Sequence, residues 1–202
     1  MIAIIDYGVG NLFSLQSSFA AIGKEAVVTS DPAVIEAADH LILPGVGAFE
    51  DAAKKLRDSG MADLIKREAA AGKPIMGICL GMQLLLDKSY EYGEHEGLGL
   101  IHGSVRPIAD VIDEGLKIPH IGWNRLIVKK PSPLFKYLND GDCVYFVHSY
   151  YAADCGDVSA TAEYSAELTA SVEKDNVYGC QFHPEKSGGV GLNILRAFCE
   201  EV

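Results

Sequence analysis

The stretch KPIMGICLGMQLLLDKSYE, residues 73–91, decides the fold. Within it a short apolar run, residues 75–78, leads to Cys79, and apolar residues with helical spacing follow the cysteine. Gly77 and Gly81 stand two residues before and two residues after Cys79. This spacing is typical of a nucleophile elbow, a sharp turn from a strand into a helix, here with a thiol in place of the usual serine hydroxyl.

The two glycines have a physical reason in such a turn. The backbone at the turn residue is strained, and side chains two residues away would clash there. The side chain at the tip also lies at the N-terminus of the next helix, whose positive dipole end favours a thiolate. A buried structural cysteine is the commoner role of a single cysteine. The glycines on both sides of Cys79 favour the nucleophilic role instead.

The residues around this stretch predict an α/β fold. Buried-type strands at 2–5, 25–29, 40–43 and 75–78 alternate with helices at 12–22, after Pro32 and within 49–71, which predicts a parallel sheet with helices on both faces. After about residue 92 short strands dominate, at 100–106, 116–121, 125–129, 144–152, 160–163, 168–174 and 177–183, before a last helix at 189–200. We therefore expect a single domain over 1–202, with a central, mostly parallel sheet flanked by helices and a β-rich antiparallel second half.

Composition excludes several classes of protein. The net charge is −11 and no Lys/Arg cluster occurs, which argues against a nucleic-acid partner and indicates a soluble, self-repelling surface. No apolar run is long enough to cross a membrane, and the N-terminus reads as a strand and not as a signal peptide. The five cysteines form no C-x-x-C pair, so we expect neither a disulfide framework nor a metal site, and we expect a cytoplasmic location.

A nucleophilic cysteine needs a base and a group that orients the base. His183 ends an apolar segment, GCQFHPEKS, and Glu185 follows two residues later. In an extended segment these two side chains point to the same side, and we expect Pro184 to keep the segment extended. A single histidine at a strand end is usually only a hydrogen-bonded structural residue. Together with the elbow, however, the pair predicts a Cys79–His183–Glu185 catalytic triad.

Acyl transfer also needs hydrogen-bond donors for an oxyanion. One candidate is the backbone N–H of Leu80, which opens the helix after the elbow. The other is the turn Pro44-Gly45-Val46-Gly47 at the end of the preceding strand, because neighbouring parallel strands bring their carboxyl ends together. A plain strand-to-helix turn is an equally good interpretation of these glycines taken alone.

Taken together, GICLGMQLL and the downstream FHPE resemble the triad-type, class I glutamine amidotransferases. Further segments, IIDYGVGNLFSL, LPGVGAF, PHIGWN, FVHSYY and GCQFHPEKSG, resemble the glutaminase subunits of imidazole glycerol phosphate synthase over nearly the whole chain. The resemblance implies site residues one by one. It implies catalysis by Cys79, His183 and Glu185, oxyanion contacts from Val46, Gly47 and Leu80, glutamine contacts from Gln83, Glu91, Ser149 and Tyr150, and a partner interface at Asn11, Trp123 and Lys186.

Some of these residues also have ordinary structural interpretations. Gln83 fits a solvated helix position, Glu91 a charge at a helix end, and Trp123 a core aromatic. The resemblance further implies that the chain hydrolyses L-glutamine without a metal or cofactor and supplies ammonia to a (β/α)₈ cyclase in a heterodimer. The cyclase would make imidazole glycerol phosphate and an aminoimidazole carboxamide ribotide in histidine biosynthesis. Three alternatives stay open: the glutaminase of another synthase, such as the pyridoxal phosphate one, a cysteine hydrolase without glutamine specificity, and a non-catalytic regulatory module.

Overall fold

The computed structural model describes all residues, 1–202. Its main sheet has eight strands: Ile2–Ile5 (β1), Ala26–Thr29 (β2), His40–Leu43 (β3), Ile75–Ile78 (β4), Ile127–Val128 (β9), Val158–Tyr164 (β12), Ala166–Lys174 (β13) and Val177–Cys180 (β14). The order is β2-β1-β3-β4-β14-β13-β12-β9. The first five of these pair in parallel, and β13, β12 and β9 continue the sheet in antiparallel fashion. The predicted mixed, mostly parallel sheet is confirmed.

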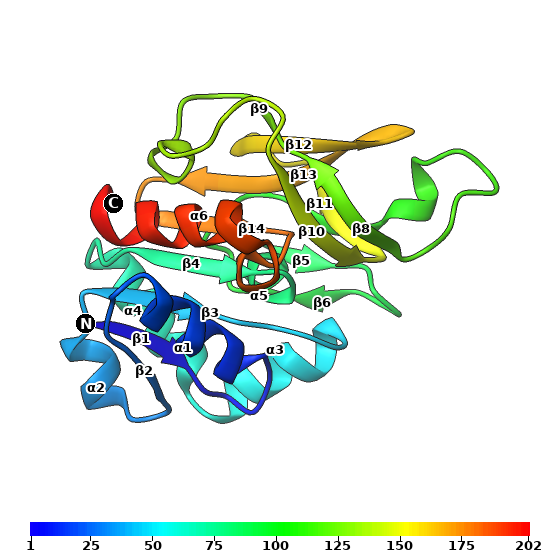
Figure 1. Cartoon of the computed structure of the whole chain (residues 1–202). Helices are drawn as coiled ribbons and strands as arrows, with labels where there is room; N and C mark the ends of the chain where they lie inside the picture. Colours follow the sequence, from blue (N-terminus) through cyan, green and yellow to red (C-terminus); the bar gives the residue numbers. More distant parts are fainter.

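Helices cover both faces of this sheet because its strands are apolar on both sides. On one face, Ile2 and Ile4 share a core with Leu12–Ala21 (α1) and Gly188–Glu200 (α6). On the other, Ala3 and Ile5 pack with the helices Pro32–Ala37 (α2), Phe49–Asp58 (α3) and Met61–Ala70 (α4). Figure 1 shows α1 and α6 lying in front of the strands. One hydrophobic core therefore lies on each face of the sheet.

The second half of the chain adds two smaller sheets. The strands Cys143–His148 (β10) and His120–Arg125 (β8) form an antiparallel ribbon. The other sheet has the order β11-β7-β5-β6 and consists of Tyr150–Ala153, Ser104–Pro107, Lys88–Ser89 and His95–Glu96. Three short 3₁₀ helices, η1, η2 and η3, span Ile108–Asp110, Pro133–Phe135 and Pro184–Lys186. In Figure 1 the β8–β10 ribbon lies at the end of the molecule opposite to the two termini, beyond the carboxyl ends of the parallel strands.

Several strand bounds differ from the prediction. The strand expected at 100–106 begins at Ser104, the one expected at 177–183 ends at Cys180, and the short strands β5 and β6 are not among those expected. The segment 144–152, expected as one strand, is divided at Ser149, because β10 pairs with β8 whereas β11 pairs with β7. The strand expected at 116–121 begins only at His120. In both segments the partner strand decides where pairing begins and ends.

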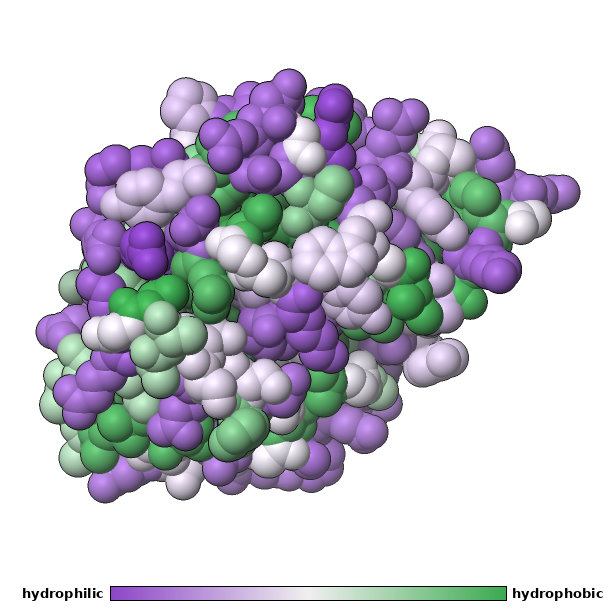
Figure 2. Space-filling view, in the orientation of Figure 1, coloured by the Kyte–Doolittle hydropathy of each residue, from purple (hydrophilic) through white to green (hydrophobic).

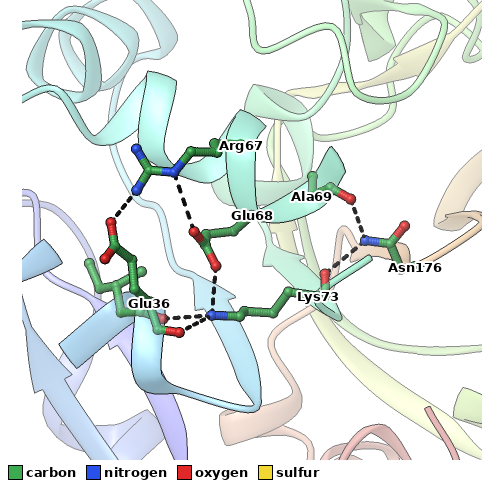
Figure 3. Close-up of polar contacts among 7 residues, drawn as sticks. Glu36, Arg67, Glu68, Ala69, Lys73 and Asn176 are labelled. Carbon is green, nitrogen blue, oxygen red and sulfur yellow. Dashed lines mark hydrogen bonds and ion pairs between the residues drawn. The ribbon is translucent and has the colours of Figure 1, made fainter. Parts of the chain in front are cut away.

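A polar cluster joins elements at the edge of the sheet where the parallel strands begin (Figure 3). Lys73 Nζ donates to the carbonyl oxygens of Ile35 and Glu36, at 3.0 and 2.7 Å, and pairs with Glu68 Oε2 at 2.7 Å. The Asn176 amide donates to the carbonyls of Ala69 and Lys73. The cluster thereby ties the end of α2 to α4 and to the β13–β14 turn.

The face shown in Figure 2 carries hydrophobic residues in several patches separated by hydrophilic ones. None of the helices combines the length and the apolar character that crossing a bilayer requires.

Candidate active site

Cys79 occupies the turn between β4 and Leu80–Leu84 (α5), and its backbone is strained. Its φ of 56° and ψ of −113° lie in a region that L-residues rarely adopt. The turn is fixed from below by a hydrogen bond of 2.7 Å from the Cys79 N–H to the Cys180 carbonyl on the neighbouring strand. The geometry is that of the nucleophile elbow expected from the glycine spacing.

Close backbone contacts explain the glycines around the elbow. A Cβ on Gly81 would lie 1.9 Å from the Leu43 carbonyl oxygen, and one on Gly77 would lie 2.6 Å from the Gly81 carbonyl oxygen. A Cβ on Gly45 would lie 2.5 Å from the Gly81 nitrogen. A side chain on Gly45 or Gly81 would push the elbow away from the end of β3 and the turn that follows it, and one on Gly77 would push β4 away from α5.

His183 and Glu185 form the predicted contact, but through a different backbone. His183 Nδ1 lies 2.8 Å from Glu185 Oε1, and only 3% and 1% of the two side chains are exposed. The expectation that Pro184 keeps this segment extended is wrong. Pro184 opens the 3₁₀ helix η3, where its fixed φ is compatible with the first helical position. The tight turn brings the carboxylate back to the imidazole.

The surroundings of His183 favour its protonated form. Burial alone lowers the pKa of His183, but hydrogen bonds and charge interactions with Cys79 and Glu185 outweigh it and raise the pKa to about 9. Because Glu185 occupies Nδ1, Nε2 is the ring nitrogen left for Cys79. The arrangement can therefore hold an imidazolium beside the sulfur at neutral pH.

One cavity of about 560 Å³ collects most of the predicted site residues. Its lining includes Cys79, Leu80, His183, Val46, Gly47, Gln83, Glu91, Ser149, Tyr150 and Lys186. Glu185 lies behind His183, and Asn11 and Trp123 lie outside the lining. No group of His, Cys, Asp and Glu side chains in the molecule has the arrangement of a metal site.

Gln83 is buried, so it is not a solvated helix residue. Its Nε2 donates to the Tyr150 carbonyl at 3.1 Å and to Gln181 Oε1 at 2.9 Å. Both amide hydrogens are thereby used, so Oε1 is the group that Gln83 can offer to the cavity. Gln181 Nε2 in turn lies 3.7 Å from Cys79 Sγ.

The turn that carries Val46 and Gly47 is held at both ends. Before it, the buried Tyr7 hydroxyl donates to the Pro44 carbonyl at 2.7 Å. After it, the Phe49 N–H, at the start of α3, donates to Glu91 Oε2 at 2.6 Å. Between these anchors Val46 is half-exposed, and Gly47 has a φ of +91° with open space around its Cβ position.

The three residues predicted for a partner interface lie at or near the surface. Asn11 precedes α1 and makes no side-chain capping hydrogen bond, and Lys186 is exposed at the edge of the cavity. Trp123 is 58% exposed on β8, so it is not a core aromatic. Ile121, two residues earlier on the same side of the strand, is exposed to the same extent.

Sequence reasoning missed Gln181, Tyr7 and His148. Gln181 stands two residues before His183, and the alternation of an extended segment gave a signal that both point the same way. Tyr7 offered no such signal, because its contact to the Pro44 carbonyl joins two distant segments. His148 contacts the carbonyl of nearby Tyr150, but its contact to His120 depends on the pairing of β10 with β8.

Residues 3–202 match the family model for glutamine amidotransferase class-I. The chain therefore belongs to the class I glutamine amidotransferase family. Two solved structures show the same fold. One is a glutamine amidotransferase, with a TM-score of 0.77, 21% identity and coverage of 99% of this chain and 98% of that chain. The other is PurLQS from Thermotoga maritima, with a TM-score of 0.77, 22% identity and coverage of 99% of this chain and 97% of that chain.

Relatives with higher identity narrow the assignment. The chain is 50% identical over 203 residues to the imidazole glycerol phosphate synthase subunit HisH of Syntrophotalea carbinolica, with 98% of both chains covered. It is 51% identical over 204 residues to that of Lactococcus lactis subsp. lactis, covering 100% of this chain and 98% of the relative. Within the class, it thus belongs with the HisH subunits.

Proposed function

We propose that this chain hydrolyses L-glutamine at Cys79 and supplies the ammonia to the cyclase subunit of an imidazole glycerol phosphate synthase. The observation that carries the proposal is the single cavity that joins Cys79 to His183, with Glu185 behind the histidine. The HisH relatives, similar over the full length, supply the complex and the pathway.

The first half of the reaction forms a thioester. The Cys79 thiolate attacks the side-chain amide carbon of glutamine, and the carbonyl electrons move onto oxygen. The Leu80 N–H and a backbone N–H of the Val46–Gly47 segment stabilise this oxyanion. When the tetrahedral intermediate collapses, the protonated Nε2 of His183 gives its proton to the departing nitrogen, which leaves as ammonia. Glu185 stabilises the imidazolium until that moment.

The second half regenerates the enzyme. Neutral His183 takes a proton from water, whose oxygen attacks the thioester carbon. The second tetrahedral intermediate expels the Cys79 thiolate and releases glutamate, and His183 is again protonated. The thiolate and the imidazolium that began the cycle are restored, so protons balance without a metal or cofactor.

Four residues in the cavity fit glutamine. The free Oε1 of Gln83 is an acceptor suited to an amide NH₂, and the Glu91 carboxylate suits the α-ammonium. Ser149 and Tyr150, between β10 and β11, fit the amino-acid end of the substrate. A carboxylate in place of the amide would offer no hydrogen to Gln83, which favours glutamine over glutamate.

The surface around the cavity suits a protein partner. Val46 and Ile118 are each 45% exposed at its lining, and Ile121 and Trp123 extend the apolar surface along β8. We assign this surface, together with Asn11 and Lys186, to the cyclase in a heterodimer. All five cysteines are free, in keeping with the reducing cytoplasm as the location.

The Cys79→Ala variant tests the proposal in the assembled complex. We expect it to release no glutamate, whereas Cys143→Ala, which removes a free cysteine outside the cavity, retains activity. Glutamate release by Cys79→Ala would contradict the mechanism. Activation by a pyridoxal phosphate synthase partner and not by the cyclase would contradict the assigned complex. A site that a glutamine-mimicking diazo ketone does not alkylate would identify a non-catalytic module.

A further inference from the structure

Two buried histidines that take no part in the mechanism contact each other beside the active site. His120 on β8 and His148 at the end of β10 are directly opposite each other in the antiparallel ribbon. His120 Nδ1 lies 3.0 Å from His148 Nε2, and the residues are only 4% and 6% exposed. His148 also lines the cavity that contains Cys79.

The partners at the two ends fix the direction of donation along this pair. His148 Nδ1 lies 2.8 Å from the Tyr150 carbonyl, which can only accept, so this nitrogen carries the hydrogen. In a neutral ring His148 Nε2 must then accept, and His120 Nδ1 must donate to it. His120 Nε2 is left as an acceptor.

The contacts of Asn124, which lies on the other side of His120, lead to the same positions for the ring hydrogens. The Asn124 amide is oriented by two backbone contacts, because its Oδ1 accepts from the Arg125 N–H and its Nδ2 donates to the Glu163 carbonyl. Nδ2 is therefore also the atom that faces His120 Nε2, at 3.3 Å, and it donates there. Asn124, His120 and His148 thus form a one-way chain of donors that ends on the Tyr150 carbonyl.

The surroundings hold both rings in place and neutral. His120 stacks on Phe146 and on Tyr164, with ring centroids 5.0 and 4.3 Å away. Burial lowers the pKa of His148 to about 4, because it outweighs the hydrogen bond to the Tyr150 carbonyl, which raises the pKa. The neighbouring His120 and His183 act in the same direction as burial. Burial also lowers the pKa of His120. No carboxylate contacts either ring to offset this effect.

The Tyr150 carbonyl connects the histidines to the nucleophile. It accepts from His148 and also from Gln83 Nε2, and Gln83 and Gln181 connect it to Cys79 Sγ. If the Tyr150 carbonyl turned away, Gln83 would lose one of the two acceptors that orient its amide. The orientation of Gln83 therefore depends on a hydrogen bond from His148.

We propose that His148, supported by His120, is a positioning residue for glutamine hydrolysis, which fixes the Tyr150 carbonyl and through it the Gln83 amide and the surroundings of Cys79. The inference rests on the proposed function for its kinetic consequence. Its structural content, the tautomer of each ring, can be measured independently.

Two substitutions at one position separate the hydrogen bond from the ring. His148→Phe keeps a planar ring but has no donor. His148→Asn is smaller but keeps an N–H donor two bonds from Cβ, as Nδ1 is, and can restore the bond to Tyr150. In the complex with the cyclase, we expect His148→Phe to lower kcat/KM for glutamine roughly 10- to 100-fold, because a small displacement of positioning groups has effects of this size. We expect His148→Asn to recover most of the loss.

Alkylation of Cys79 by a glutamine-mimicking diazo ketone should follow the same order. The matched control is His40→Phe, which removes a half-buried histidine with one backbone hydrogen bond, to Val202, far from the cavity. We expect this variant to keep the wild-type rates. Wild-type rates in a folded His148→Phe, or equal losses in the Phe and Asn variants, would overturn the proposal.

Two further measurements cover the remaining outcomes. If His148→Phe does not fold, Gln181→Met interrupts the same connection at the sulfur, and wild-type alkylation in that variant would overturn the proposal. Nitrogen NMR of the histidine rings in the full chain should show hydrogen on Nδ1 of both His120 and His148. Hydrogen on Nε2 of either ring would overturn it, whereas a wild-type complex without glutaminase activity would contradict the proposed function instead.

Discussion

His183 Nδ1 lies 2.8 Å from Glu185 Oε1, although only Pro184 separates the two residues in the chain. The contact depends on the 3₁₀ turn that Pro184 opens, and the hydrogen bond from the Ser187 hydroxyl to the His183 carbonyl, at 2.6 Å, closes that turn. The orientation of the imidazole therefore comes from one short segment, whereas its raised pKa depends on Cys79 as well as on Glu185.

Replacing Glu185 by Gln should slow hydrolysis and narrow its pH range. The hydrogen bond can persist, but the negative charge that helps to raise the pKa of His183 is lost. We expect kcat to fall by roughly 10³- to 10⁴-fold, as in other triads. Because the first step needs the imidazolium, wild-type activity should decline as the pH rises through about 9, and the variant should decline at lower pH. The pH profile of kcat in the complex measures this, and Glu25→Gln, an exposed site, is the control. An unshifted alkaline limb would contradict the assigned role.

Adding one methyl group to Gly81 should destabilise the protein. The new Cβ would lie 1.9 Å from the Leu43 carbonyl oxygen, so either β3 or the elbow must move. We expect Gly81→Ala to lower the free energy of unfolding by about 3 kcal/mol. The control is Gly189→Ala in α6, where nothing lies within 4 Å of the new atom, and there we expect a gain of about 0.5–1 kcal/mol. Urea unfolding of both variants tests the prediction, which equal stabilities would refute.

Glu91 should contribute more to substrate affinity than to folding. A glutamine at this position keeps an oxygen for the Phe49 N–H but loses the charge suited to an ammonium group. We expect Glu91→Gln to raise KM for glutamine roughly 10- to 100-fold, the range for losing a charge-assisted hydrogen bond, with little change in the unfolding midpoint. Steady-state kinetics and thermal unfolding provide the two readings. A KM like that of an exposed control, Glu94→Gln, would argue against the ammonium contact.

Stability should fall in acid because His148 is buried and neutral. Its folded pKa of about 4 is below the ordinary value of 6.5, so between these values only the unfolded state takes up the proton. The contribution of His148 to the free energy of unfolding is therefore fully present above pH 6.5. It is lost as the pH falls, and the loss amounts to roughly 3 kcal/mol at pH 4. Urea unfolding from pH 7 to 4 should show a steeper decline for the wild type than for His148→Asn, which cannot titrate there. Parallel curves would rule out this origin.

Removing the Lys73 ammonium should cost stability without affecting chemistry (Figure 3). Lys73→Met leaves the largely buried Glu68 carboxylate without its closer cation, and the two α2 carbonyls without a donor. We expect a loss of about 2–4 kcal/mol, and an unchanged kcat because the cluster lies at the opposite edge of the sheet from Cys79. For comparison, Lys54→Met breaks an exposed pair with Asp58 and should cost less than about 1 kcal/mol. Chemical unfolding and glutaminase assays make the comparison, and similar losses in both variants would contradict it.

Features that depend on residues close together in the sequence could be predicted, whereas features that depend on the pairing of distant strands could not. The elbow was predictable because the strained turn requires glycines two residues before and two residues after the nucleophile, and Gly77 and Gly81 occupy these positions around Cys79. The His120–His148 contact was not predictable, because the sequence of neither strand alone determines the pairing register between β8 and β10. The division at Ser149 was missed for a similar reason. All residues from 144 to 152 suit a strand, and only the change of partner strand separates β10 from β11.

The anchors on either side of Val46 and Gly47 limit how this turn can move. Tyr7 forms a hydrogen bond to the Pro44 carbonyl, and Glu91 accepts a hydrogen bond from the N–H of Phe49, the first residue of α3. Gly45 packs closely against the Gly81 backbone. A rearrangement between these fixed ends takes the form of a peptide flip. One or two peptide planes rotate about the line that joins their flanking Cα atoms, and the Cα atoms stay in place. Such a rotation reverses the direction of an N–H group while moving few other atoms. A partner that contacts the half-exposed Val46 side chain can therefore reorient this N–H group without deforming the sheet.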